Sequence, residues 1–497
     1  MSQKYDDLKR LCNEIALQGG ILAELSWNQE TYMPKGAHAN RANQIELLAG
    51  IRHKLKTGPE FKKILSSLID IKTGKIKTKL SKDEETNVIR LREDFIRDHV
   101  LPVSFVEKFA KLTSEATEVW QRARQENKFK LFLPYLEKLV TLNQEKADRY
   151  GFDEHPYDAL LDGYEPGVTT RDIRDNFDPL KKTLQEFVKK ARSAKIKLPF
   201  KTYPQEEQFE LSRRLLEKLP YDFNNGRLDI STHPFSSAQH PTDSRITTRI
   251  DLKDPLSSIL TVLHEAGHAL YEMGLNAKYF GLPLGEPISY GIHESQSRWW
   301  ETRIGLSLAF WKGFTPLLHS MNILNGVSAE KLYQYVNHVE PSFIRVEADE
   351  LTYPLHVILR FELETALIDG SLKAKDLPEK WNELMKTYLG ITPKTDTLGC
   401  LQDVHWSHGS FGYFPTYLLG NMYAAQLFDA FEKEHPNWKK RVEKLDLPFI
   451  KEWLNNNIHR HGRRYQAMEL IKKVTKKPFS SKPYIDYLEN KYITGKK

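Results

Sequence analysis

The sequence has very little cysteine, since only Cys12 and Cys400 occur in 497 residues. Two cysteines exclude the disulfide framework of small secreted proteins and fit a reducing compartment. The chain also has no uninterrupted apolar run near the roughly 20 residues that a membrane-spanning helix needs. Its first ten residues lack an apolar core of signal-peptide length. We therefore expect a cytoplasmic protein with no membrane partner.

The sequence lacks a strong excess of either charge sign. Its 73 lysines and arginines oppose 66 acidic residues, which gives a net charge of +7. The lysines collect in two loop-like runs, 72–82 and 189–201, and at the tail, and neither run interleaves aromatic residues as a nucleic-acid groove would. We interpret both runs as solvated surface and expect no nucleic-acid partner.

The chain has no repeat of fixed period and no low-complexity linker, so we do not divide it into independent domains. We expect one domain over residues 1–497, with a possible helical N-terminal lobe 1–200 and a catalytic lobe 201–497. Apolar residues at helical spacing predict a mainly α fold. The predicted helical segments are 5–26, 37–56, 83–98, 103–127, 132–150, 170–195, 287–312, 328–338, 355–369, 377–388, 416–433 and 447–461.

A different pattern lies between Gly226 and Asp254. Residues 227–230 and 244–251 alternate apolar and polar side chains, which is the period of a strand. We expect a small antiparallel sheet beside the helix that follows. An edge of that sheet could bind an extended peptide by backbone pairing, or the strands could form a structural hairpin without a ligand.

The segment 254–274 carries the clearest chemical signal in the chain. Asp254 is a good N-cap, Pro255 suits the first helical position, and Gly274 is a natural left-handed stop. His264 and His268 lie four residues apart, so their imidazoles project from one helix face and can share an ion. Glu265 is near enough to take a proton from water without ligating the ion. This is the His-Glu-x-x-His arrangement of zinc peptidases.

The alternative for this motif is a surface histidine pair on an ordinary helix. Gly267 argues against it, because a glycine inside a helix costs roughly 1 kcal/mol relative to alanine. We expect another part of the chain to pack closely at Gly267.

A catalytic zinc site usually has three protein ligands. The best third candidate is Glu294, in a segment that Ser289 can cap and where Arg298 can hold the carboxylate from one turn away. His293 is the competing ligand, but on a helix it points about 100° away from Glu294, so we expect the ion to use only one of them. Taken alone, Glu294 and Arg298 would be an ordinary surface pair.

Several further motifs occur in a specific order along the chain. They are His233-Pro-Phe235, Asp243-Ser-Arg245-Ile-Thr247, His264-Glu-Ala-Gly-His268, His293-Glu-Ser-Gln296, Ile344-Arg-Val-Glu-Ala-Asp349 and Gly399-Cys-Leu-Gln-Asp-Val-His-Trp406. Earlier in the chain come Trp27-Asn-Gln29, Met33-Pro34 and Tyr164-Glu-Pro-Gly167. In these motifs the chain resembles the carboxypeptidase Taq family of thermostable metallocarboxypeptidases over nearly its full length. Asn28 stands where that family leads us to expect aspartate.

The resemblance implies a single, mainly helical fold with a deep active-site groove, one zinc ion per subunit with cobalt as a possible substitute, and a homodimer. It also implies removal of C-terminal residues from peptides with a free C-terminus, with broad preference and poor action at proline. Carried over by motif, His264, His268 and Glu294 are the metal ligands and Glu265 is the general base.

Further roles follow from motif position and chemistry. We expect His405 and one of Tyr413 and Tyr417 to stabilise the oxyanion, and either tyrosine could equally be an aromatic core residue. Arg345 is our candidate for the substrate carboxylate, because its fork binds carboxylates in bidentate fashion, whereas the alternative is a structural pair with Asp349. Two further candidate substrate contacts are Arg245, a weaker alternative, and Gln402.

Three functional hypotheses remain open at this point. The first is a metallocarboxypeptidase that uses metal-activated water and a glutamate base. The second is a zinc oligopeptidase or endopeptidase of similar fold, which would cleave internal bonds at the same ion. The third is a non-catalytic helical scaffold that binds a metal.

Overall fold

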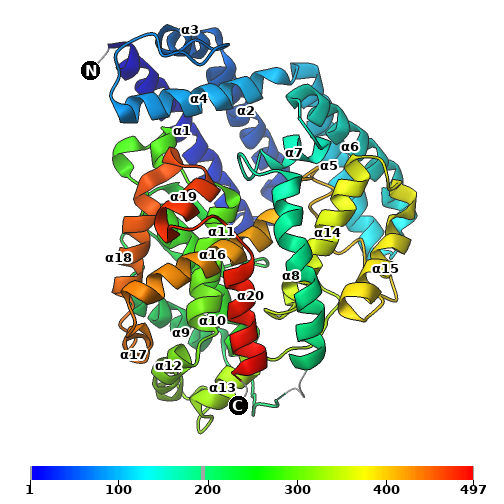
Figure 1. Cartoon of the computed structure of the whole chain (residues 1–497), viewed down its shortest axis with the longest axis vertical. Helices are drawn as coiled ribbons and strands as arrows, with labels where there is room; N and C mark the ends of the chain where they lie inside the picture. The colour runs from blue at the N-terminus through cyan, green and yellow to red at the C-terminus, as the bar shows by residue number, and fades with distance from the viewer. Residues whose placement is uncertain (1–2, 192–195, 496–497) are drawn as a thin grey trace.

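The computed structural model describes residues 3–191 and 196–495. It confirms the predicted mainly α class, since 67% of the chain is helical. Helices α8, α14 and α15 lie on the right in Figure 1, and α10, α11 and α16 lie on the left. Residues 192–195, which end the predicted segment 170–195 and fall within the second lysine run, lie outside the described residues.

The first half of the chain is almost entirely helical. Its helices are α1 (Gln3–Thr31), α2 (His38–Thr57), α3 (Pro59–Leu68), α4 (Lys82–Val100), α5 (Val103–Gln125), α6 (Phe129–Tyr150), α7 (Pro156–Leu161), α8 (Thr170–Ala191) and α9 (Gln205–Lys218). Ser81 and Glu84 form a capping box at the start of α4, which satisfies two backbone amides there. The six predicted segments of this half each coincide with a helix, whereas α3, α7 and α9 were not predicted.

The second half begins with the sheet and continues as helices. These are α10 (Pro255–Met273), α11 (Tyr290–Arg298), α12 (Leu308–Ser320), α13 (Ala329–Val336), α14 (Tyr353–Ile368), α15 (Leu377–Leu389), α16 (Pro415–Glu434), α17 (Trp438–Val442), α18 (Pro448–Asn457), α19 (Ala467–Thr475) and α20 (Lys482–Glu489). The predicted segment 287–312 covers α11, a π-helical stretch η4 (Trp299–Gly305), and the start of α12. Helices α17, α19 and α20 were not predicted.

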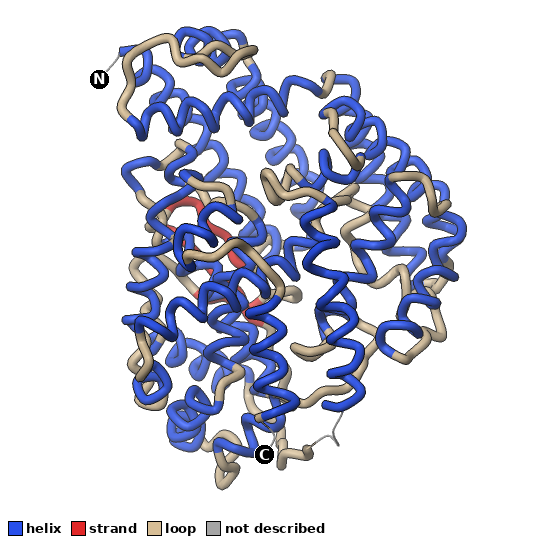
Figure 2. The backbone as a smooth tube through the Cα atoms, in the orientation of Figure 1, coloured by secondary structure: helices blue, strands red, loops and turns tan. Residues whose placement is uncertain are grey.

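The sheet has strands β1 (Leu228–Ile230), β2 (Ser236–His240) and β3 (Asp243–Thr248) in the order β1-β3-β2. Figure 2 shows it enclosed by helices, and it packs against α10 as expected. The expectation of an antiparallel sheet is wrong for one pair: β1 and β3 run parallel, because the unpredicted β2 forms the hairpin with β3. Strand β2 reads Ser-Ser-Ala-Gln-His and has no apolar alternation to reveal it. Peptide binding at a sheet edge stays a prediction.

Helix α10 begins as predicted and ends differently. The Asp254 side chain accepts a hydrogen bond from the Leu256 amide, which confirms the N-cap. Gly274 has φ −87° and is not the left-handed stop we expected. A Cβ at Gly274 would lie 2.4 Å from His459 Nδ1, so close packing against the C-terminal region, not turn geometry, accounts for this glycine.

Close backbone packing also explains Gly267 in α10. A Cβ at Gly267 would lie 2.5 Å from both the Gln296 carbonyl oxygen and Ser297 Cα of α11. A Cβ at Gly420 of α16 would lie 2.5 Å from Glu294 Cγ of the same helix α11. Helix α11 is thus held between α10 and α16 by two glycines, and the expected close contact at Gly267 is confirmed.

Most buried side chains form one continuous cluster that extends from Phe105 to Tyr492. A smaller cluster lies between α1, α3 and α4, at the top of Figure 1. Within residues 3–191 and 196–495, no helix combines the length and the apolar character needed to cross a lipid bilayer.

Replacing Gly267 by alanine should lower the unfolding free energy by about 1–3 kcal/mol, the usual cost of overpacking. Gly50→Ala is the matched control, because Gly50 lies within α2 and a Cβ added there would meet no atom of the described chain within 4 Å. The unfolding free energy of Gly50→Ala should rise by up to about 1 kcal/mol from helix propensity alone. Denaturant unfolding of both variants measures this, and equal gains in both would contradict the packing we describe.

Candidate metal centre

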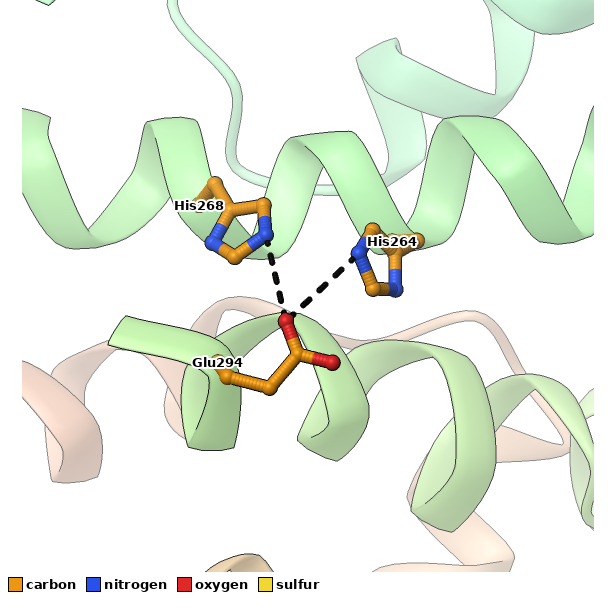
Figure 3. A group of neighbouring side chains, drawn as sticks. All are labelled: His264, His268 and Glu294. Carbon is orange, nitrogen blue, oxygen red and sulfur yellow. Dashed lines mark ion pairs between the residues drawn. The ribbon is translucent and has the colours of Figure 1, made fainter. Parts of the chain in front are cut away.

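The side chains of His264, His268 and Glu294 converge between α10 and α11. One ligand atom from each lies within 4.8 Å of the other two. Glu294 Oε2 is 3.8 Å from His264 Nε2 and 3.6 Å from His268 Nε2, the contacts drawn in Figure 3. Ligand atoms around a tetrahedral zinc ion lie about 3.3 Å apart when each bond is about 2.0–2.1 Å long. The three donors therefore fit a single divalent ion after small movements of their side chains.

Helix α11 presents Glu294 in a fixed orientation. Ser289 caps the helix by accepting a hydrogen bond from the Ile292 amide, as predicted. Ser297 donates a 3.1 Å hydrogen bond to Glu294 Oε2, and the glycine contact with Gly420 restricts the stem of the side chain. Glu294 is buried, so a divalent ion would compensate a charge that is costly to leave unpaired.

The second nitrogen of His264 is held by a carboxylate. Glu301 Oε2 lies 2.8 Å from His264 Nδ1, and Arg298 donates to the same oxygen over 2.7 Å. Burial alone would raise the pKa of Glu301, but Arg298 and His264 hold it at about 2. Arg298 also lies 3.9 Å from Glu294, so it supports the predicted carboxylate while its shorter contact is with Glu301. The arrangement leaves His264 Nε2 directed at the ion site.

The second nitrogen of His268 contacts another histidine. His268 Nδ1 and His293 Nδ1 are 2.6 Å apart, and His293 Nε2 lies 2.9 Å from Glu272 Oε1. Both nitrogens of His293 are engaged in this way. As expected, Glu294 and not His293 points toward the shared position.

Glu265 lies on α10 next to His264, and its carboxylate forms no hydrogen bond or ion pair with any residue in the described part of the chain. Burial raises its pKa to about 7, and the neighbouring Glu294 and Glu301 add to that rise against the opposing effect of His264. A carboxylate with a pKa near the working pH is suited to accept and return a proton.

Arg345 lies in the short helix η5 (Arg345–Glu347) and is buried, with 5% of its surface exposed. Its Nε and Nη2 donate to Asp403 Oδ1, so the structural partner is Asp403 and not the Asp349 that we considered. Arg360 donates to the other oxygen of Asp403. Two buried guanidinium groups thus share one carboxylate, which leaves an excess positive charge at this end of the site.

Both polar atoms of the Gln402 side chain are occupied by hydrogen bonds within the protein. Its Oε1 accepts from the Arg345 amide and from Arg360, and its Nε2 donates to three backbone carbonyl oxygens. Gln402 therefore positions the two arginines. Arg245, the weaker candidate, is bidentate to Asp243 and also pairs with Glu24 of α1.

His405, Tyr413 and Tyr417 form a half-buried group. His405 Nε2 lies 3.2 Å from the Tyr417 hydroxyl, and burial lowers the pKa of His405 to about 3, so its ring is neutral. Tyr417 packs over the Arg345 guanidinium, 4.8 Å from its Cζ to the ring centre. Burial and the charge of Glu294 raise the pKa of Tyr413, and burial raises that of Tyr417. Both tyrosines therefore carry their protons near neutral pH and can donate hydrogen bonds.

Two buried carboxylates that sequence reasoning missed support this site from behind. Glu165 accepts from the Ser289 hydroxyl, the Gly291 amide and the Tyr423 hydroxyl, at the N-terminus of α11. Glu364 accepts from the Tyr157 hydroxyl, the Trp406 indole and the Gly412 amide, and so fixes the loop that carries His405. Glu165 lies within the Tyr-Glu-Pro-Gly motif, which was the one available signal for it.

The chain is similar to known proteins over nearly its whole length. The model of the family described as carboxypeptidase Taq (M32) metallopeptidase matches residues 7–492. Thermostable carboxypeptidase 1 of Thermus thermophilus is 39% identical over 98% of this chain and 98% of its own, and carboxypeptidase 1 of Bacillus subtilis is 38% identical over 98% and 97%. The crystal structure of an M32 carboxypeptidase from Deinococcus radiodurans superposes with a TM-score of 0.95 at 36% identity, covering 99% of both chains.

Glu165→Gln should change how stability depends on pH. Burial raises the pKa of Glu165 from 4.5 to about 7, so between these values the folded protein holds a proton that the unfolded chain releases. The contribution of Glu165 to stability is complete below pH 4.5 and is lost as pH rises to about 7. The rise of the Glu165 pKa from 4.5 to about 7 corresponds to about 3 kcal/mol. The unfolding free energy of Glu165→Gln, relative to that of the wild type, should therefore rise by up to about 3 kcal/mol between about pH 5 and 8.

Denaturant unfolding at several pH values measures this difference. Glu118→Gln, at an exposed position of α5, is the control and should show no such trend. A difference between Glu165→Gln and wild type that stays constant with pH would mean that Glu165 keeps its ordinary pKa.

Proposed function

Because the chain belongs to the carboxypeptidase Taq (M32) metallopeptidase family and is a peptide hydrolase, we propose that it removes C-terminal residues from peptides with broad preference, and acts poorly at proline. His264, His268 and Glu294 hold the ion in this proposal. The observation that carries it is the convergence of three donors within 4.8 Å, beside a glutamate with no partner among the described residues. Two imidazoles and one carboxylate suit zinc, and cobalt is a possible substitute.

Glu265 is the general base in this mechanism. When bound, a divalent ion supplies Lewis-acid polarisation of the scissile carbonyl and makes water easier to deprotonate. The Glu265 carboxylate accepts the proton from water and then donates it to the leaving amine. The burial of Glu265 beside His264, and a carboxylate that no other described residue holds, support both steps.

One of the two tyrosines stabilises the negative charge that develops on the carbonyl oxygen. We assign this hydrogen bond to Tyr413, because the charge of Glu294 is the second cause of its raised pKa after burial, whereas for Tyr417 the same charge comes after burial, Arg345 and two tyrosines. His405 and Tyr417 form a hydrogen-bonded pair beside it. Such preorganised donors each contribute a few kcal/mol to transition-state stabilisation, about 10²–10³-fold in rate.

Arg345 recognises the free carboxylate of the substrate. The balance of buried charges supports this role, since the two cations Arg345 and Arg360 share the single carboxylate of Asp403. A substrate carboxylate at this position would neutralise the excess charge. Asp403 and Gln402 keep the guanidinium in place, so little of its conformational freedom is lost on binding.

The assembly and location belong to the same proposal. We propose a cytoplasmic homodimer, and a single domain over residues 1–497 in which the continuous core crosses the expected lobe boundary near residue 200. Helix α2, which is described along its whole length, buries no residue, and four apolar side chains of the packed pair α1 and α2 are exposed by 42–65%. They are Leu17, Ile21, Leu47 and Ile51. A second copy of the chain covering this face would remove their contact with water.

Glu265→Gln should reduce peptide hydrolysis by about 100- to 10,000-fold, because the amide cannot accept the proton from water. The metal content should stay at that of the wild type, since Glu265 is not a ligand in this proposal. Glu330→Gln on the exposed face of α13 is the control and should be fully active. Released amino acid and bound metal are measured on the same preparation. Unchanged hydrolysis would remove Glu265 as the base and favour a different catalytic arrangement.

Arg345→Gln should reduce kcat/KM for a peptide with a free C-terminus by about 10- to 100-fold, the loss of charge-assisted hydrogen bonds. It should also abolish the preference for that peptide over its C-terminally amidated twin. Arg345→Lys should be intermediate, because it keeps the charge and loses the fork. In both variants Asp403 remains paired with Arg360.

Arg245→Gln is the comparison variant, and we expect it to keep the preference for the free acid. Loss of the preference in Arg245→Gln alone would move the assignment to Arg245. Equal turnover of both peptides by the wild type would replace the carboxypeptidase proposal with the oligopeptidase hypothesis.

A further inference from the structure

We propose that His293 and Glu272 are positioning residues that fix the orientation and the tautomer of His268. The inference rests on the proposed function, in which His268 is a metal ligand. The three side chains form a chain of contacts that begins and ends on α10: His268 to His293 of α11 over 2.6 Å, and His293 to Glu272 over 2.9 Å. Glu272 lies one turn after His268 on the same helix, so the chain closes a ring between the two helices.

The protons in this chain can be assigned from its two ends. Glu272 at one end is a carboxylate that accepts hydrogen bonds, so His293 Nε2 carries a proton and donates it to Oε1. A neutral His293 then has a lone pair on Nδ1, which accepts from His268 Nδ1–H. His268 is left with its lone pair on Nε2, the nitrogen 3.6 Å from Glu294 Oε2 and directed toward it in Figure 3. Each imidazole has one proton, and no donor faces another donor within this chain of described side chains.

The reverse arrangement cannot ligate an ion through His268 Nε2, and with a neutral His293 it is also unfavourable at the Glu272 end. If His268 carried its proton on Nε2, that N–H would point at the ion position and could not ligate. His268 Nδ1 would then need a proton from His293 Nδ1, and His293 Nε2 would place a lone pair against the Glu272 carboxylate. Glu272 therefore determines, through the ring of His293, which nitrogen of His268 is available to the ion.

This chain differs from the support of the other histidine ligand. His264 Nδ1 contacts Glu301 directly over 2.8 Å, and Arg298 holds that carboxylate. At His268 an imidazole stands between the ligand and the acid. Tyr271 packs against the His293 ring with the ring centres 5.2 Å apart, which restricts rotation of His293. Two different outer contacts thus leave Nε2 of both histidines facing the same point.

The contacts also argue against His293 as a ligand. Its Nδ1 faces the nitrogen of His268 that points away from Glu294, and its Nε2 faces Glu272. Neither nitrogen is directed at the point shared by His264, His268 and Glu294.

The test measures zinc affinity of the full-length protein by competition with a chromophoric chelator, together with the absorption spectrum of the cobalt form. Outer contacts of metal-ligating histidines usually contribute about 10–100-fold in affinity. We expect His293→Phe to weaken zinc binding by about that factor and to alter the cobalt spectrum. His293→Asn should recover most of the affinity, because its amide oxygen can accept the His268 Nδ1–H bond. Glu272→Ala should weaken binding less than His293→Phe does.

Two matched controls separate positioning from general loss of a side chain. His319→Phe removes a half-buried histidine of α12 whose ring contacts the Val327 carbonyl, and Glu330→Ala removes an exposed acid of α13. Both should bind zinc as the wild type does. Circular dichroism and thermal unfolding of the metal-free variants check the fold, and His293→Asn with Glu272→Ala keep the test decisive if His293→Phe does not fold.

The outcomes distinguish this inference from the proposal on which it rests. His268→Phe should abolish tight zinc binding, and wild-type affinity in that variant would overturn the metal centre itself. If His268→Phe fails to bind but His293→Phe and Glu272→Ala bind zinc as the wild type does, the positioning role is wrong and the metal centre stands. The chain of contacts would also be contradicted if His293→Phe lost zinc affinity, His293→Asn did not recover it and Glu272→Ala left it unchanged.

Discussion

The packing of α11 between α10 and α16 is the constraint on which the candidate site depends. Glycines at 267 and 420 remove the side chains that would otherwise separate the helices, and the backbone of one helix approaches the next directly. This approach brings a carboxylate of α11 to within 3.6–3.8 Å of two imidazoles on α10. A metal site needs its donors fixed to within about half an ångström, and rigid helices provide this better than loops.

The charges around the site are separated by sign. The buried Glu265 and Glu294 and the half-buried Glu301 lie at or next to the candidate ligand His264, where Arg298 pairs with Glu301. Arg345 and Arg360 share the single carboxylate of Asp403. Buried charges are stable only when paired or bound to an ion. The acidic side therefore favours a divalent cation and the basic side an anion. A peptide with its carbonyl at the ion and its carboxylate at the arginines would satisfy both.

Sequence reasoning succeeded where the signal was local. The two histidines, the adjacent glutamate and the caps at Asp254 and Ser289 depend on spacings of a few residues along one helix, and the structure has them as expected. The mainly α class followed from helical periodicity in the same way. Short helices such as α7 were not predicted, because one or two turns contain too few apolar positions to establish a period. Strand β2 shows no alternation of apolar and polar residues, so the relative directions of the paired strands could not be inferred.

The partners of the site residues could not be predicted, because they are distant in the sequence and each is an ordinary charged residue until the fold is known. Arg345 pairs with Asp403, 58 positions away, and not with Asp349, the acid one helical turn along the sequence. Glu165 meets Ser289 across 124 positions. Spacing identifies which side chains can share an ion, but tertiary packing selects which acid compensates which cation. Spacing along the sequence therefore identifies the candidate ligands of such a centre, whereas the contacts that orient them require the structure.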